Sequence, residues 1–182
     1  TLFPEVRDYW LPWEGVFHNL TVVALEKEYP GHAKKVMQGL WGSGQMSFCK
    51  AMVMVDHDAP LHRGKELLSH LLDRVDLKRD VMITEGILDV LDHSSPHENY
   101  GSKVGIDATT PVKGEPPRRN REATAAQPLR AETILADLQA REPALTGCRV
   151  LFEGAGHPII ALTLDRDRAP VSRRAVEVLI AG

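Results

Sequence analysis

Residues 50–58 read Lys-Ala-Met-Val-Met-Val-Asp-His-Asp, an apolar run between a lysine and an acidic group. Five consecutive apolar residues, Ala51 to Val55, are typical of a strand that is covered on both faces of its sheet. Such strands run parallel to their neighbours, and helices connect them across the two faces. The stretch therefore predicts an α/β fold.

Strand and helix patterns alternate on both sides of this run. The apolar segments at 18–25 and 80–84 predict one strand before it and one after it. Between the strands, a segment from Gly31 to Gly39 or beyond and another at 64–75 carry apolar side chains at helical spacing. The order predicts a parallel-rich sheet with crossover helices, a β-α-β-α-β core.

The second half of the chain predicts a long loop and then a smaller unit. Glycines, prolines and serines interrupt every pattern from about Asp92 to Pro128. Beyond it, a helix at about 131–141, strands at 149–153 and 159–164, and a short helix at 172–180 predict a small C-terminal α-β-β-α module. The sequence thus predicts two domains, 1–128 with the loop and 129–182.

Composition limits the classes of function. The formal net charge of −3 and the lack of aromatic residues between the basic ones argue against nucleic-acid binding. No apolar run reaches the length of a membrane helix, and a cytoplasmic location is expected. The two cysteines, Cys49 and Cys148, are expected to be free thiols. Because the chain opens with Thr1 and no methionine, we expect a segment of a longer protein.

Three polar groups are candidate sites. Asp56, His57, Asp58 and His62 have the side chains of a divalent-metal site, but their spacing matches no metal motif, and a solvated, capping strand end is the favoured interpretation. Arg118, Arg119 and Arg121 suit phosphate or an acidic partner, or a solvated loop. The run from Gly101 to Gly105 has the composition of a phosphate-binding loop without the P-loop spacing, and no base is placed beside Ser102.

Lys50 is the most informative of the charged residues. It precedes a strand predicted to lie inside the sheet, where an unpaired charge would be costly. We therefore expect either an anionic partner for its ammonium or an exit of the side chain to solvent.

Five segments, in order, together resemble the UbiD family of decarboxylases. They are EGVFHNLTVV at 14–23, YPGHAKKVMQGLWG at 29–42, KAMVMVDHD at 50–58, DRVDLKRDVMI at 73–83 and YGSKVGIDAT at 100–109. The resemblance covers roughly the first 110 residues. Within the family, the chain looks most similar to the decarboxylases of menaquinone and ubiquinone biosynthesis. The module after about Pro128 resembles, less specifically, the tail of the longer, menaquinone-pathway-like members.

This resemblance implies decarboxylation of an aromatic acid of the hydroxybenzoate or hydroxynaphthoate type. The cofactor would be prenylated FMN, with a divalent metal, Mn²⁺ or Mg²⁺, and a monovalent cation at its phosphate. The catalytic acidic residues and metal ligands of the family match no block of this chain, so we expect them before Thr1 and expect the chain alone to be inactive, with no cofactor or metal of its own.

Residue by residue, the resemblance assigns few roles. Lys50 matches a family lysine that contacts the cofactor phosphate, and Lys103 and Asp107 lie in a segment that approaches the active site or its cation. The implied partners are the protein's own N-terminal flavin domain, a small aromatic acid and further copies of the chain. Two alternatives remain: a stand-alone interaction or assembly domain, and a metal-dependent hydrolase built on Asp56, His57 and His62.

Overall fold

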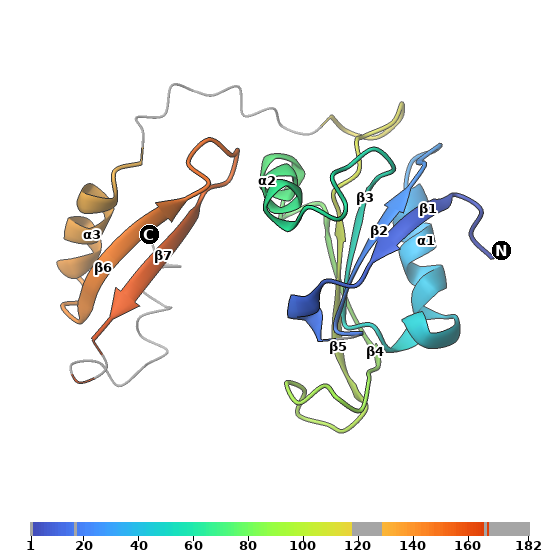
Figure 1. Ribbon diagram of the computed structural model, residues 1–182, viewed down its shortest axis with the longest axis horizontal. Coiled ribbons are helices and arrows are strands. Elements are labelled where there is room, and N and C mark those ends of the chain that lie inside the picture. Colours follow the sequence, from blue (N-terminus) through green and yellow to red (C-terminus); the bar gives the residue numbers. More distant parts are fainter. Residues whose placement is uncertain (1, 17, 118–128, 166, 168–182) are drawn as a thin grey trace. The chain divides into compact units, whose positions relative to one another are not determined.

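The computed structural model describes residues 2–16, 18–117, 129–165 and 167. The chain forms two compact units, Thr1–Asn120 and Arg121–Gly182, each with its own internal contacts (Figure 1). No helix within the described ranges is both long and apolar enough to cross a membrane.

The first unit is an α/β unit, as predicted. Its strands, helices and short 3-10 helices follow in the order β1 (Val6–Trp10), η1 (Trp13–Gly15), β2 (Leu20–Leu25), α1 (His32–Trp41), η2 (Gly44–Phe48), β3 (Ala51–Asp56), α2 (Gly64–Arg74), β4 (Val81–Ile87) and β5 (Tyr100–Asp107). The helices α1 and α2 lie on opposite faces of the sheet (Figure 1).

The sheet has five strands in the order β1-β2-β3-β5-β4. The three central strands are parallel, since β3 pairs with β2 on one side and with β5 on the other. Both edge strands are antiparallel to their neighbours. The predicted third parallel strand at 80–84 does form, as β4, but it is an antiparallel edge strand, and β5 takes the parallel position beside β3.

The predicted loop from Asp92 to Pro128 is wrong in its first part, because it contains β5. The buried positions of this strand are Gly101, Lys103, Gly105 and Asp107. None of them is apolar in the usual sense, so the alternation that marks a strand is absent from the sequence. Gly105 lets α1 approach the strand closely, because a Cβ atom at this position would lie 2.0 Å from Sδ of Met37 on α1.

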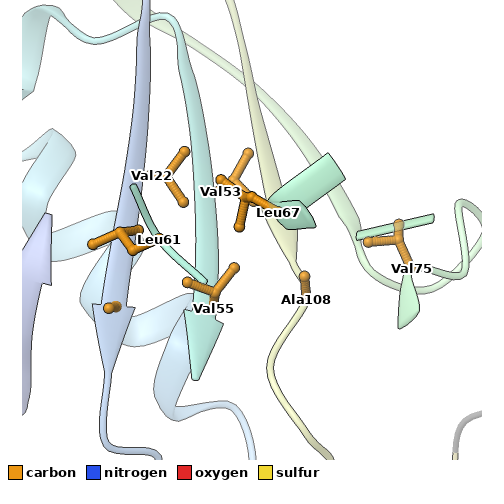
Figure 2. Close-up of a cluster of buried hydrophobic side chains, with 8 residues drawn as sticks. Val22, Val53, Val55, Leu61, Leu67, Val75 and Ala108 are labelled. Atoms are coloured by element: carbon orange, nitrogen blue, oxygen red, sulfur yellow. The ribbon is translucent and has the colours of Figure 1, made fainter. Parts of the chain in front are cut away.

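Alternate residues of the central strands form two separate cores. Val22, Val53 and Val55 pack with Leu67 of α2 on one face (Figure 2). Val23, Leu25, Met52 and Met54 pack on the other face with Val36 and Met37 of α1. Because both faces are covered, β2 and β3 are mostly apolar, which is the pattern that revealed these two strands in the sequence.

The second unit contains α3 (Ala131–Gln139), β6 (Leu145–Leu151) and β7 (Ile159–Leu164), and the two strands pair antiparallel. This matches the predicted order α-β-β, with the first strand starting four residues earlier than the predicted 149. The predicted helix at 172–180 lies outside the described residues. Cys49 and Cys148 are free, as expected.

Candidate functional site

Lys50 immediately precedes β3 and its side chain meets the loop between β4 and β5. Its Nζ atom lies 2.8 Å from Oδ2 of Asp92, 2.6 Å from Oγ of Ser94 and 2.9 Å from Oγ of Ser95. The lysine side chain is 25% exposed and that of Asp92 only 4%. The structure thus gives Lys50 both the anionic partner and the partial exit to solvent that its position demands.

Asp92 organises the loop around this lysine. Its Oδ1 atom accepts hydrogen bonds from the backbone N–H and the hydroxyl of Ser94, and its Oδ2 atom accepts one from the hydroxyl of Ser95. The ammonium of Lys50, followed by the Ser94 hydroxyl, holds the pKa of Asp92 far below its ordinary value. We call Lys50, Asp92, Ser94 and Ser95 the amino-edge cluster, because it lies where β3 begins.

Lys103 lies beside this cluster but faces the interior. It is 3% exposed, and its Nζ donates to the carbonyl oxygens of Ser47, at 2.8 Å, and Cys49, at 2.6 Å. The same nitrogen lies 5.7 Å from the centre of the Trp41 ring. Burial lowers the pKa of Lys103, and the neighbouring Cys49 opposes that effect. Lys103 is therefore not placed to touch a ligand directly.

Asp107 lies at the other end of the sheet. It is four residues beyond Lys103 on the same face of β5, about 13 Å away along an extended strand. Its Oδ2 atom lies 3.7 Å from Nζ of Lys27, and its Oδ1 atom accepts the backbone N–H of Thr109 at 3.0 Å. Of the three residues that the family resemblance singled out, the structure brings Lys50 and Lys103 together and separates Asp107 from them.

A hollow of about 280 Å³, most of whose lining residues are charged, opens where the central strands end. Lys27, Gly31, Lys34, Arg79, Asp80, Asp107, Pro111, Glu115 and Pro116 line it. The carboxylate of Glu115 accepts several hydrogen bonds in this hollow. Lys27 donates to it at 2.6 Å, and the backbone N–H groups of Gly31 and Val112 donate to it at 2.9 and 3.1 Å. The carboxylate of Glu115 thus occupies the amino end of α1, where an anion is favoured.

A second hollow, about 260 Å³ and mostly apolar, lies near the amino-edge cluster. Phe48, Ile87, Leu88, Asp89, Val90 and Asn99 line it. The hollow and the amino-edge cluster meet at Gly101. A Cβ atom at this position would lie 2.6 Å from Oγ of Ser95, in the cluster, and 3.1 Å from Cδ1 of Leu88, in the hollow. This edge of the sheet therefore combines a partly exposed ammonium with apolar surface.

The predicted metal ligands are not brought together. Asp56 accepts hydrogen bonds from the backbone and the hydroxyl of Thr110, and His62 lies 2.8 Å from Asp8. His57 and Asp58 are exposed. No group of three potential metal ligands occurs within the part of the chain that the structure describes.

The glycine-rich candidate at 101–105 is part of β5 and not a loop. Ser102 is exposed on this strand and lies opposite Glu85 of β4. Arg118, Arg119 and Arg121 lie outside the described residues.

Sequence reasoning missed Asp92, Ser94 and Ser95 as partners of Lys50. They are 42 to 45 residues away from it, inside a segment interpreted only as loop. The sole signal was composition, because an aspartate followed by serines is a common way for side chains to bond a turn. Nothing in the sequence linked that turn to Lys50.

The α/β unit with Lys50 before its central strand β3 matches a known protein family over most of its length. The family model for the 3-octaprenyl-4-hydroxybenzoate carboxy-lyase C-terminal domain, UbiD_C, matches residues 1–108. The chain belongs to this family, which confirms the resemblance inferred from its five sequence segments.

Relatives and solved structures agree with this assignment. A protein of Archaeoglobus fulgidus is 44% identical over 115 residues, which are 63% of this chain and 24% of that protein. A protein of Helicobacter pylori strain J99 is 43% identical over 108 residues, which are 59% of this chain and 17% of that protein. Both relatives are uncharacterized. The chain thus spans no more than about a quarter of these relatives.

Solved structures of UbiD-class enzymes and of other decarboxylases also resemble the chain. The UbiD-class enzyme HmfF from Pelotomaculum thermopropionicum in complex with FMN matches with a TM-score of 0.55 and 28% identity, covering 66% of this chain and 28% of the enzyme. The open form of vanillic acid decarboxylase from Sedimentibacter hydroxybenzoicus matches with a TM-score of 0.59 and 25% identity, covering 77% and 30%.

Proposed function

We propose that this chain is the C-terminal domain of a carboxy-lyase that decarboxylates an aromatic acid of the hydroxybenzoate or hydroxynaphthoate type. In this proposal the cofactor is prenylated FMN, and Lys50 contacts its phosphate. The observation that carries the proposal is the partly exposed ammonium of Lys50 at the sheet edge of a chain in the UbiD family. Its similarity to an enzyme solved with FMN supports the choice of cofactor.

The amino-edge cluster has the donors that suit a phosphate. An ammonium and two hydroxyl groups are strong partners for phosphate oxygens. All three protons of Lys50 have acceptors in the structure, so a phosphate would replace one serine oxygen, and the exposed Ser94 would turn its hydroxyl from Asp92 to the phosphate. Asp92 would keep the lysine in place throughout.

When bound, prenylated FMN supplies the electron sink for cleavage of the carbon–carbon bond. The chain's own part is to hold the phosphate with Lys50 and Ser94 and to exclude water from that edge. The proposal includes a divalent metal, Mn²⁺ or Mg²⁺, and a monovalent cation at the phosphate, with no ligand assigned to this chain.

Partners in the proposal are the protein's own flavin domain and further copies of the chain. Support comes from large apolar side chains that water reaches freely: Trp13 at 93%, Leu77 at 75%, Ile83 at 74% and Val90 at 73% exposure. The same exposure favours the alternative of a stand-alone assembly domain. That alternative predicts that this chain associates with itself, as light scattering would show, and that it has no affinity for flavin.

Two matched variants test the cofactor contact in the longer polypeptide that carries a flavin domain. Lys50→Met is expected to weaken flavin retention by the roughly 1.5 to 3 kcal/mol of a charge-assisted contact. Asp92→Asn leaves the ammonium in place and is expected to retain flavin within about threefold of the unsubstituted protein. Wild-type flavin occupancy in the Lys50→Met protein would refute the assignment, and equal losses in both variants would show that the lysine only supports the loop.

A further inference from the structure

Lys103 is a buried cation whose partners are all uncharged. Among the described residues it forms no salt bridge, and its ammonium is satisfied by two carbonyl oxygens and the face of Trp41. Burying an ammonium without a carboxylate is costly, so the hydrogen bonds of Lys103 to these carbonyl oxygens must offset the loss of its hydration.

The two carbonyl groups belong to the junction between η2 and β3. Ser47 lies in the last turn of η2. Cys49 is the first residue after η2, and Lys50 comes next. The last carbonyls of a helix lack partners within the helix and need donors from elsewhere. Lys103 supplies both of them from β5, and a charged donor binds carbonyl oxygens more strongly than a neutral one.

The backbone of β5 fixes the next carbonyl as well. The N–H of Val104 donates to the carbonyl oxygen of Lys50 at 2.9 Å. Two consecutive residues of β5 thus hold three carbonyl groups of the segment that ends at Lys50. The side chain of Lys50 is held at its far end by Asp92, so its direction depends on where this backbone lies.

The neighbouring strand leaves room for the lysine. Gly86 of β4 lies beside the aliphatic stem of Lys103, and a Cβ atom at position 86 would approach Cε of Lys103 to 3.0 Å. A methyl group there would press on the stem without removing the charge. The substitution Gly86→Ala is therefore a second and independent way to disturb the same contacts.

We propose that Lys103 is a positioning residue that holds the 47–50 backbone so that the ammonium of Lys50 meets Asp92, Ser94 and Ser95. It touches no ligand itself. The use of this arrangement for a cofactor phosphate rests on the function proposed above, whereas the arrangement itself does not.

The carboxyl group of Asp92 reports on the arrangement, and its titration can be followed by ¹³C NMR in this 182-residue chain. Lys50→Met should raise the pKa of Asp92 by about one unit or more, because the opposite charge is lost. Lys103→Met should raise it in the same direction by a smaller amount. The double variant should titrate like Lys50→Met alone, since Lys103 acts only through Lys50.

Val55→Ala, a core truncation at the carboxyl end of β3, is the control for general destabilisation and should leave the titration of Asp92 unchanged. Should Lys103→Met not fold, Gly86→Ala should raise the pKa of Asp92 in its place. An unchanged Asp92 titration in the folded Lys103→Met or Gly86→Ala chain overturns the inference. The inference is also overturned if the shifts in the pKa of Asp92 caused by Lys50→Met and Lys103→Met add up in the double variant.

Flavin retention in the longer polypeptide separates this inference from the proposed function. If the inference and the proposed function both hold, Lys103→Met weakens flavin retention by roughly tenfold or less, within the range of one lost contact. If the titration of Asp92 moves while Lys50→Met leaves flavin retention unchanged, Lys103 positions Lys50 as inferred and the proposed cofactor contact is wrong.

Discussion

Lys50 and Asp92 lie 42 residues apart in the sequence, and their Nζ and Oδ2 atoms lie 2.8 Å apart in the fold. The pair joins the start of the central strand β3 to the loop that connects the edge strand β4 to the central strand β5. It places a positive charge at the sheet edge together with the carboxylate that fixes its direction.

The first prediction concerns the stability of this pair. Lys50→Met leaves the carboxylate of Asp92, which is 4% exposed, without its counter-charge. We expect the free energy of unfolding to fall by about 1.5 to 3 kcal/mol. Urea unfolding of the single variants and the double variant Lys50→Met/Asp92→Asn measures this. The double variant should lose less than the two single variants combined, and simple additivity would contradict a direct interaction.

The second prediction concerns the close approach of α1 to β5. Gly105→Ala would place a Cβ atom 2.0 Å from Sδ of Met37. Overpacking of this kind costs about 1 to 3 kcal/mol of unfolding free energy. Gly42→Ala is the matched control, because its Cβ would meet nothing nearer than 3.5 Å. Similar unfolding curves for the two variants would show that α1 does not pack here as described.

The third prediction concerns Glu115 and the segment that leads out of the first unit. Burial alone would raise the pKa of Glu115, but the ammonium of Lys27 and the N–H groups of Gly31 and Val112 outweigh it and lower that pKa. Glu115→Ala should speed hydrogen exchange at the amides of Gly31 and Val112 by about tenfold, the equivalent of one lost hydrogen bond. The exposed Glu28 is the control position, and equal exchange in Glu28→Ala and Glu115→Ala would contradict the contact.

The fourth prediction is a pH dependence that originates at Glu5. The side chain of Lys35, then the backbone and His32, lower the pKa of Glu5 from 4.5 to about 2. A carboxyl group with a lowered pKa in the folded state stabilises the fold above its ordinary pKa, and this contribution disappears as pH falls toward 2. Unfolding free energies of the wild type and Glu5→Gln should therefore differ at pH 6 and converge near pH 2. A constant difference across this range would exclude Glu5 as the source.

The central strands β2 and β3 and the helices α1 and α2 could be predicted because their buried positions are occupied by apolar residues. Ala51 to Val55 is covered on both faces and shows it directly. Strand β5 was missed because its buried face consists of two glycines, a lysine and an aspartate. Strand β1 was missed because three of its five residues are exposed and carry no strand pattern.

The candidate site was predictable only in part, for a similar reason. Lys50 could be found because a charge before an inner strand needs a partner. Its partners could not, because the contact between residue 50 and residues 92–95 depends on the placement of β5 and its loop. The burial of Lys103 likewise depends on a carbonyl pair that no sequence pattern marks.

The most direct test of the account is carbon dioxide release from a carboxyl-labelled hydroxybenzoate or hydroxynaphthoate. It compares this chain, incubated with prenylated FMN, with the longer polypeptide that joins the chain to a flavin domain. The proposed function predicts release by the longer polypeptide and none by the chain alone. Release by the chain alone, or none by the cofactor-loaded longer polypeptide with either class of acid, would contradict it.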